Sequence, residues 1–251
     1  MRRQSIIGAA ISLAAYVAGS VMATAGEIKV MSSVAIKEAY LELVPAFERA
    51  SEHKVTTLWV PTVDMMTRLK GGEVVDLVIM AAPAIDELTK AGKIVASSRV
   101  DIAKSGVGIA VRAGAPRPDV SSVDALKRTL LAAKSIAYST GPSGVYLTGL
   151  FQRMGIADEI KSKVKQVQGE PIGAVIARGD AEIGFQQISE LLPVKGIDFL
   201  GPLPAEIQQI TVFSAGLHAA AKEPAAVKAF VKFLTTPDAG TVFKKAGMEP
   251  G

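Results

Sequence analysis

The stretch STGPSG, residues 139–144, has residue types and spacing suited to holding an anion. It follows a strand-like apolar run and precedes a helix-like pattern. Gly141 and Gly144 let the backbone approach a ligand closely, and the free N–H groups and dipole of a helix start attract negative charge. Pro142 and Ser143 would equally form an ordinary turn and helix cap, so these residues alone leave binding and capping open.

Three hydroxyl residues, Ser32, Ser33 and Thr62, fall where strands are expected to end and helices to begin. Open α/β sheets usually bind ligands at this edge. Helix capping explains each hydroxyl singly, but their joint placement favours a site. Trp59, the single tryptophan, is expected to pack in the core or to form a wall of that site.

The residues needed for several catalytic sites are missing from the sequence. There is no cysteine, and the two histidines, His53 and His218, are isolated, so a zinc site built from nitrogen and sulfur ligands is nearly excluded. The stretch 139–144 has no lysine after its second glycine, and Val145 replaces the last glycine of a nucleophile elbow. We therefore predict no enzyme activity, metal or cofactor. An exported hydrolase, which would need a serine, a histidine and an acid, stays as an alternative.

The N-terminus has the pattern of an export signal. Arg2 and Arg3 precede an uncharged apolar run, residues 6–22, which ends in the A-x-A motif at residues 23–25. A transmembrane anchor fits less well because the run is short and has no charge on its far side. We predict a signal peptide over residues 1–25, cleavage after Ala25 and a periplasmic protein without disulfides.

Charge argues for a small-molecule partner. Removing residues 1–25 takes away two arginines and no acidic residue, so the net charge falls from +4 to +2. The remaining lysines and arginines are scattered, which gives no basic surface for nucleic acid.

Short apolar runs alternate with amphipathic stretches from Glu27 onward, which predicts an α/β fold with a parallel or mixed sheet. Breaks at residues 97–105 and 201–209 are the expected linkers. If the chain crosses between two lobes at these breaks, the first lobe is discontinuous and the crossings form a hinge. The expected division is residues 26–108 plus 209–251 for lobe 1 and 109–208 for lobe 2.

Five segments, taken in order, resemble one known family. They are IKVMSSVAIKEAYLELVPAFE, GGEVVDLVIMAAPAIDEL, GPSGVYLTGLFQRMGI, AVIARGDAEIGFQQISEL and PAAVKAFVKFLTTPDAGTVFKKAGM. Their order is similar to that in the molybdate-binding-protein-like solute receptors of ABC importers, across essentially the whole chain after residue 25. The resemblance implies a two-lobed periplasmic-binding-protein fold, with mixed sheets flanked by helices, that closes over a ligand.

The resemblance also implies a set of ligand-binding residues in the two lobes. The first family serine falls on Ala35, with two serines just upstream, and the family tyrosine of the second lobe falls on Gln187. The predicted ligand-binding residues are Ser32, Ser33, Thr62, Val63, Ser143, Gly144, Tyr146, Gly169 and Gln187. Arg68 and Arg153 are further candidates for meeting a carboxylate.

Departures from the family pattern bear on the ligand. Gln186 and Gln187 offer both donors and acceptors, which suits an organic carboxylate better than a compact oxyanion such as molybdate. We expect a monomeric receptor that captures a small anionic solute and delivers it to an inner-membrane ABC permease. A periplasmic sensor of the same fold is the alternative, because both would use lobe closure.

Overall fold

The computed structural model describes residues 26–251 of the 251-residue chain. The predicted signal peptide, with its cleavage after Ala25, lies outside the described residues. No helix within residues 26–251 is long and apolar enough to cross a membrane.

Ten strands form one mixed sheet in the described part of the chain, in the order β2-β1-β3-β9-β4-β7-β5-β6, with β8 and β10 also paired to β4. The strands are β1 (Glu27–Ser32), β2 (Lys54–Trp59), β3 (Leu77–Ala81), β4 (Val100–Arg112), β5 (Ile136–Ser139), β6 (Val164–Val167), β7 (Ile183–Gln187), β8 (Ile197–Pro202), β9 (Ile210–Leu217) and β10 (Glu249–Pro250). Strands β6, β8 and β10 were not predicted, because they are short or exposed and lack an apolar run.

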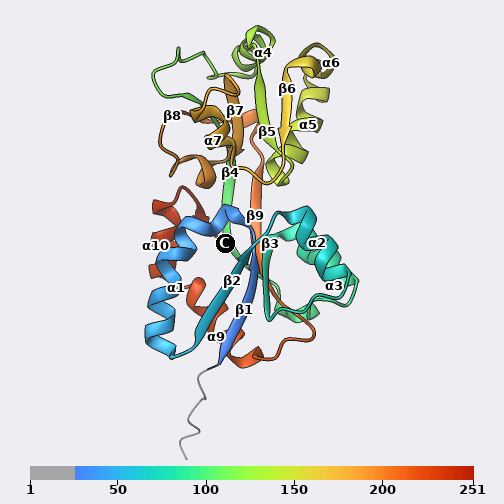
Figure 1. The fold of residues 1–251 in the computed structure, drawn as a ribbon, viewed down its shortest axis with the longest axis vertical. Coiled ribbons are helices and arrows are strands. Elements are labelled where there is room, and N and C mark those ends of the chain that lie inside the picture. Colours follow the sequence, from blue (N-terminus) through green and yellow to red (C-terminus); the bar gives the residue numbers. More distant parts are fainter. Residues whose placement is uncertain (1–25) are drawn as a thin grey trace, which may run out of the picture.

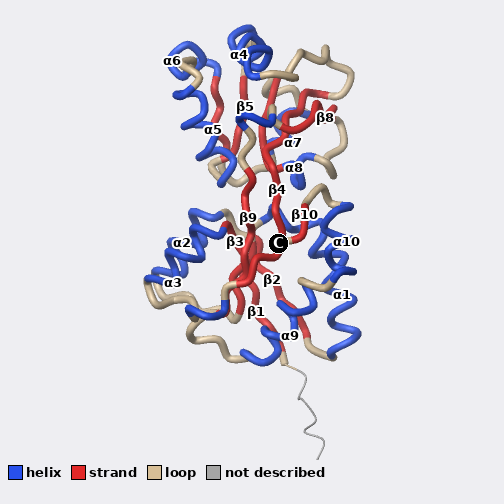
Figure 2. Tube along the Cα trace, turned by 180° about the vertical axis from the view of Figure 1, so that it is seen from behind, coloured by secondary structure: helices blue, strands red, loops and turns tan. Residues whose placement is uncertain are grey.

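Helices cover the sheet in both halves of the molecule (Figure 2). The α-helices are α1 (Lys37–Ser51), α2 (Thr62–Lys70), α3 (Ala82–Lys90), α4 (Val123–Ala132), α5 (Pro142–Arg153), α6 (Ala157–Ile160), α7 (Ile172–Ala177), α8 (Ile188–Leu191), α9 (Pro224–Leu234) and α10 (Pro237–Lys245). The 3-10 helices are η1 (Val34–Ile36), η2 (Ala96–Ser98), η3 (Lys161–Lys163) and η4 (Ala205–Ile207).

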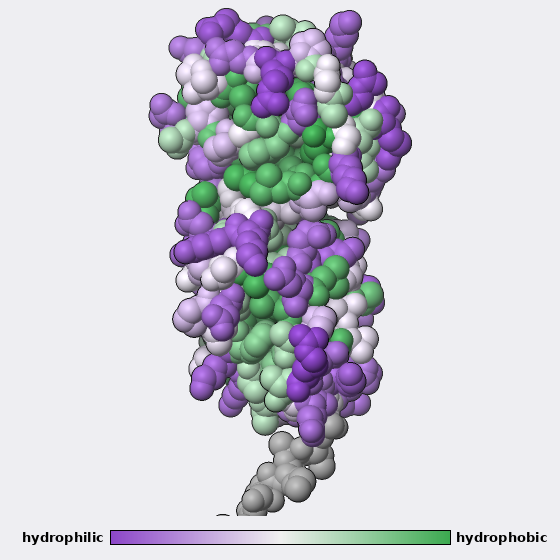
Figure 3. Space-filling model, turned by 90° about the vertical axis from the view of Figure 1, so that its left-hand side faces the viewer, coloured by the Kyte–Doolittle hydropathy of each residue, from purple (hydrophilic) through white to green (hydrophobic). Residues whose placement is uncertain are grey.

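The molecule is elongated and has two lobes (Figure 1). Lobe 1 contains β1 to β3 with α1 to α3, α9 and α10, and lobe 2 contains β5 to β8 with α4 to α8. Strands β4 and β9 run through the waist that joins the lobes, and the space-filling view narrows at the same level (Figure 3). The predicted two-lobed α/β fold is therefore confirmed.

Strand β4 changes partner where it passes between the lobes. Its first half pairs with β9 as far as Gly106, and from Val107 onward it pairs with β7. The linker expected over residues 97–105 is a regular strand from Val100 onward, because β9 satisfies the backbone hydrogen bonds of this segment. The lobe boundaries at residues 108 and 209 stay a proposal, and the change of partner at Gly106 supports the first of them.

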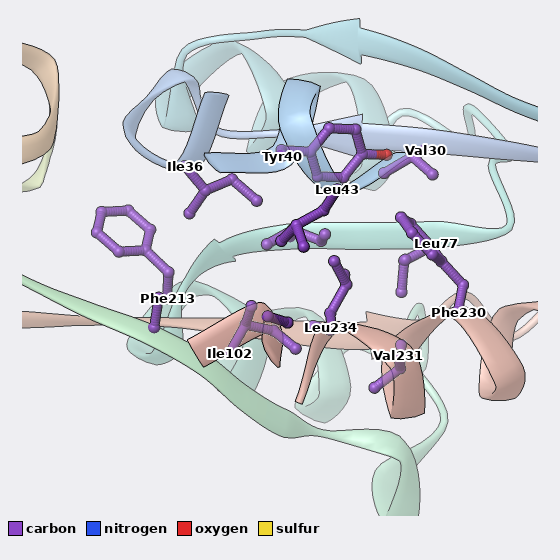
Figure 4. Close-up of a cluster of buried hydrophobic side chains, with 14 of the residues drawn as sticks. Val30, Ile36, Tyr40, Leu43, Leu77, Ile102, Phe213, Phe230, Val231 and Leu234 are labelled. Atoms are coloured by element: carbon purple, nitrogen blue, oxygen red, sulfur yellow. The ribbon is translucent and has the colours of Figure 1, made fainter. Parts of the chain in front are cut away.

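Lobe 1 has a core of aromatic and aliphatic side chains between α1, α9 and the sheet (Figure 4). Tyr40 from α1 packs edge-on against Phe230 from α9, with ring centroids 5.7 Å apart. The Tyr40 hydroxyl is satisfied by Thr57 at 2.7 Å, so this buried polar group does not weaken the core.

Lobe 2 has a separate core around β7 and α5. Leu147, Leu150 and Phe151 are buried at helical spacing along one face of α5. Phe151 meets Phe185 of β7 with ring centroids 6.1 Å apart. The packing of α5 on the sheet fixes the position of the first turn of this helix, which begins directly after β5.

Several helices begin where the strands of both lobes end toward the waist. Helix α2 follows β2 in lobe 1, while α5 follows β5 and α8 follows β7 in lobe 2. Strands β1 and β2 are parallel, as are β5, β6 and β7, so their carboxyl ends share an edge in each lobe. This arrangement brings helix starts from two lobes to one place.

Candidate functional site

A cavity of about 320 Å³ lies between the two lobes. This volume falls within the range of roughly 300–1,000 Å³ usual for small-molecule sites. Lobe 1 lines it with Ser33, Val34, Trp59, Pro61, Thr62, Val63 and Asp64, and lobe 2 with Ser139, Thr140, Gly141, Pro142, Ser143, Val167, Gly169, Glu170, Pro171, Gln186 and Glu190. We call this cavity the interlobe cleft.

The start of α5 is the best-defined part of the cleft. Gly144 makes its position possible, since a Cβ atom there would lie 1.5 Å from the Ser139 carbonyl oxygen. Gly141 is the N-cap residue and Pro142 occupies the first turn, and no side chain within residues 26–251 caps the helix. The first N–H groups of α5 are therefore available to a ligand.

Ser143 places a buried hydroxyl at the same helix start. The residue is 1% exposed, and its Oγ has no hydrogen-bond partner among the described residues. An unsatisfied buried polar atom costs about 1–3 kcal/mol, so such atoms are rare unless they have a role. Because Ser143 lines the cleft, a bound ligand can supply the missing partner.

Lobe 1 contributes the start of α2. Pro61 is the N-cap residue and makes no side-chain cap, and Thr62 and Val63 follow in the first turn. Asp64 lies in the same turn, and its carboxyl partly offsets the positive end of the α2 dipole. The first turn of α5 has no acidic residue, so it is the stronger anion site of the two.

Two carboxyl groups of lobe 2 face the cleft in different environments. Burial raises the pKa of Glu190 to about 7, against the opposing hydrogen bond from Gln186. Hydrogen bonds from the Arg178 guanidinium instead lower the pKa of Glu170. Glu170 is therefore ionised near neutral pH, whereas Glu190 divides between its two protonation states.

Gln186 makes two hydrogen bonds, one that fixes its own side chain and one that orients Glu190. Its Oε1 accepts from the Ile172 backbone N–H at 2.8 Å, and its Nε2 donates to Glu190 Oε1 at 2.7 Å. The glutamine thus joins the first turn of α7 to the carboxyl that follows β7. No lysine or arginine lines the cleft within residues 26–251, so N–H groups, hydroxyls and one amide carry its attraction for anions.

Five of the nine predicted ligand-binding residues line the cleft: Ser33, Thr62, Val63, Ser143 and Gly169. The other four are not among its lining residues. Ser32 is fully buried and donates to the Ser33 carbonyl, and Gly144 packs against β5. The Tyr146 hydroxyl donates to the Ile207 carbonyl at 2.6 Å.

Gln187, the fourth of these residues, lies where β4 and β9 pass between the lobes. When its amide is oriented to satisfy every group, the nitrogen donates to the carbonyls of Ser105 at 3.0 Å and Gly106 at 3.2 Å. The oxygen then accepts from the Thr211 hydroxyl at 2.9 Å. Its side chain therefore joins the two crossing strands, β4 and β9.

The two candidate arginines lie outside the cleft lining. Arg68 pairs with Glu73, its Nε 2.6 Å from the carboxylate. The Arg153 guanidinium lies over the Tyr146 ring, 5.3 Å from its centroid.

Sequence reasoning missed Glu190. The residue stands four positions after Gln186, across a strand end and the first turn of a helix. The sequence did show an acidic residue at the edge of the sheet where ligands bind. The burial of Glu190, however, depends on the facing lobe. Trp59, proposed as either a core or a cleft residue, serves as both.

The groups needed for hydrolysis or metal binding are not placed together in residues 26–251. No histidine lines the cleft there: the His218 Nδ1 accepts from the Ala220 N–H, and burial lowers the pKa of this histidine. No group of three or more His, Cys, Asp or Glu in the same residues is arranged to hold a metal ion.

Comparison with curated proteins gives two informative relatives. An aconitate isomerase from a Pseudomonas species is 38% identical over 229 residues, covering 89% of this chain and 87% of the relative. The molybdate-binding protein ModA of Azotobacter vinelandii is 29% identical over 237 residues, covering 90% of each chain. One of these relatives is named as an isomerase and the other as a binding protein.

Comparison with solved structures and family models agrees with the fold. The periplasmic molybdate-binding protein of Azotobacter vinelandii superposes with a TM-score of 0.75 at 18% identity, covering 89% of this chain and 99% of that structure. Residues 28–249 match the family model described as bacterial extracellular solute-binding protein. With its two lobes, interlobe cleft and match over nearly all of the described residues, the chain belongs to the bacterial extracellular solute-binding protein family.

Proposed function

We propose that this protein captures a small organic carboxylate in the interlobe cleft, in the periplasm, and delivers it to an inner-membrane ABC permease. The observation that carries the proposal is the buried Ser143 hydroxyl, which lacks a partner and lies at the uncapped start of α5. A carboxylate oxygen can accept from this hydroxyl and from the first N–H groups of the helix. The family membership supports the transport role.

The lining favours an organic anion over molybdate. A longer molecule can place a carboxylate at α5 and its carbon atoms against apolar side chains such as Trp59 and Val63. The relative named aconitate isomerase supports this class, because aconitate is an unsaturated tricarboxylate.

Thermal unfolding with a panel of anions tests the proposal. The panel contains cis-aconitate, trans-aconitate, citrate, molybdate, tungstate and sulfate. A ligand at 100 times its dissociation constant adds about 2.7 kcal/mol to stability, which is a clear shift in Tm. We expect stabilisation by one or more of the carboxylates. Stabilisation by molybdate or tungstate alone would overturn the choice of ligand class, and no stabilisation by any anion would overturn the binding role.

A second candidate function is catalysis on the same class of ligand. The chain is 38% identical to a relative named as an isomerase, and a partly buried carboxyl with a raised pKa lines its cleft. Such groups are frequent at catalytic sites. Assays of cis-aconitate and trans-aconitate interconversion distinguish this function from binding alone.

A further inference from the structure

Glu190 differs from the other carboxyl groups of the cleft in how it is held. Gln186 donates to Oε1 of Glu190, and Gln186 is itself fixed by the Ile172 N–H. No hydrogen bond from another described residue occupies Oε2. One oxygen of the carboxyl is therefore positioned, and the other remains free to meet a ligand.

Glu170 provides the contrast within the same cleft. Its two oxygens accept from the Arg178 guanidinium, which also pairs with Asp180. These bonds lower the pKa of Glu170, whereas burial raises that of Glu190 to about 7. Two carboxyls with pKa values moved in opposite directions are the usual sign that they have separate roles, and the group near 7 is the one suited to proton transfer.

We propose that Glu190 is a catalytic residue that moves a proton between two carbon atoms of a bound unsaturated carboxylate, so that the cleft is an active site as well as a binding site. This inference rests on the carboxylate ligand proposed above. The group that transfers the proton lines the cleft from α8, and the groups that hold the anion lie at the start of α5. The two functions therefore come from different elements of lobe 2.

The reaction balances without a cofactor. For aconitate, the Glu190 carboxylate takes a proton from the methylene carbon that lies between a carboxylate and the C=C bond. The C–H bond breaks, an O–H bond forms on Glu190, and the electron pair spreads over the allylic carbons and the neighbouring carboxylate. Glu190 then returns the proton to the other end of the allylic system, where a new C–H bond forms and the double bond moves by one position.

The product of this step is again an aconitate, because each carbon of the three-carbon chain carries one carboxylate. The geometry of the double bond can change, since the original C=C bond is single after the transfer. The negative charge that spreads into a carboxylate during the step can be stabilised by the first N–H groups of α5 and the Ser143 hydroxyl. No oxidant or reductant is needed.

The experiment follows cis-aconitate by proton NMR in the presence of the protein, with binding measured separately by calorimetry. We expect wild-type protein to form trans-aconitate, and substrate with a deuterated methylene group to react more slowly because its C–H bond breaks. Glu190→Gln keeps the acceptor for Gln186 but cannot take a proton. It should slow isomerisation by at least about 100-fold and retain binding.

Glu159→Gln is the matched control, because it removes an exposed carboxyl of α6 in the same lobe, outside the cleft lining. This variant should isomerise aconitate within a few-fold of the wild-type rate. Isomerisation at the wild-type rate by Glu190→Gln, or wild-type protein that binds aconitate and leaves it unchanged, would overturn the inference and leave the proposed binding intact. Wild-type protein that does not bind aconitate would overturn the inference, and the panel of anions then decides whether the binding function fails with it.

Discussion

At the scale of single residues, substitution of Ser143 should affect ligand affinity and protein stability differently. Its Oγ is buried and has no partner in residues 26–251, so Ser143→Ala removes an unsatisfied group from the ligand-free protein. We expect the free energy of unfolding to stay equal or to rise by about 1 kcal/mol. A hydrogen bond to a charged ligand contributes about 1.5–3 kcal/mol, so binding should weaken by about 10–100-fold.

Calorimetry and chemical denaturation of the same samples check both effects. Ser33→Ala is the comparison in lobe 1, because its Oγ accepts from the Ala35 N–H and caps η1. That variant should lose about 1 kcal/mol of stability. Unchanged ligand affinity in Ser143→Ala would contradict the role given to this hydroxyl.

Glu190 should make stability depend on pH. Burial raises its pKa from 4.5 to about 7 in the folded protein, so the folded state holds this proton more tightly than the unfolded chain does. Stability from this group is present below about pH 4.5 and is lost as the pH rises toward 7. Glu190→Gln removes this pH dependence. Between pH 5 and pH 8, its free energy of unfolding should rise relative to that of the wild type by up to about 3 kcal/mol.

Urea unfolding of both proteins at the two pH values measures the difference. The other titratable groups near α8 are Asp64 and Glu170 in the cleft, and Glu38, Glu42 and Lys245 in a crevice. Ser189 of α8 and Leu192, the residue after α8, also line this crevice. Glu170→Gln provides the control, since its carboxylate is already ionised across this range. A difference between Glu190→Gln and wild type that does not change with pH would show that Glu190 is ionised throughout.

At the scale of elements, two glycines of α5 should respond in opposite ways to the same substitution. A Cβ at Gly144 would lie 1.5 Å from the Ser139 carbonyl oxygen, so Gly144→Ala must move the helix away from β5. We expect a loss of at least about 2 kcal/mol and weaker ligand binding. A Cβ at Gly149 meets the flexible end of the Arg153 side chain, and Gly149→Ala should stabilise the helix by up to about 1 kcal/mol.

Thermal unfolding of the two variants compares these positions directly. Equal stability of Gly144→Ala and Gly149→Ala would contradict the close approach of α5 to β5. This contact lets the helix start face the cleft, so the test also bears on the anion site.

Elements with strong local patterns were predictable from the sequence. The stretch 139–144 was expected to turn a strand into a helix, and it does so between β5 and α5. Strands β6 and β8 were not predicted, because their residues are largely exposed or half-buried and have no apolar run to mark them. The first half of β4 was interpreted as a linker, since its pairing with β9 depends on residues more than 100 positions away.

At the scale of the whole molecule, Gln187 should control how the lobes move. Its amide holds Ser105 and Gly106 of β4 and Thr211 of β9 at the point where both strands cross. Gln187→Ala removes these hydrogen bonds and should cost about 1–3 kcal/mol of stability. Gln187 does not itself line the cleft, so we expect ligand affinity to change through the equilibrium between open and closed lobes.

Small-angle scattering with and without ligand measures that equilibrium. Wild-type protein should become more compact with ligand, and Gln187→Ala should change the amount of compaction. Identical scattering of wild type and variant in both states would contradict a hinge role for Gln187.

The site could be predicted only in part, because it forms between lobes. Hydroxyls and the helix start of lobe 2 were found from local spacing, and Ser33, Thr62 and Ser143 do line the cleft. Val63 and Gly169 were chosen by resemblance and also line it. Tyr146 and Gln187 were chosen by resemblance, but Tyr146 bonds to Ile207 and Gln187 to the hinge. The role of Glu190 depends on its burial, which no local pattern reveals.

The most direct test of the central claim is a competition titration by calorimetry, in which protein without its first 25 residues is titrated with aconitate in the presence and absence of molybdate. We expect aconitate to bind one site per chain without displacement by molybdate, and Ser143→Ala to weaken this binding by about 10–100-fold. Tight binding of molybdate with displacement of aconitate, or no binding of either anion, would contradict it.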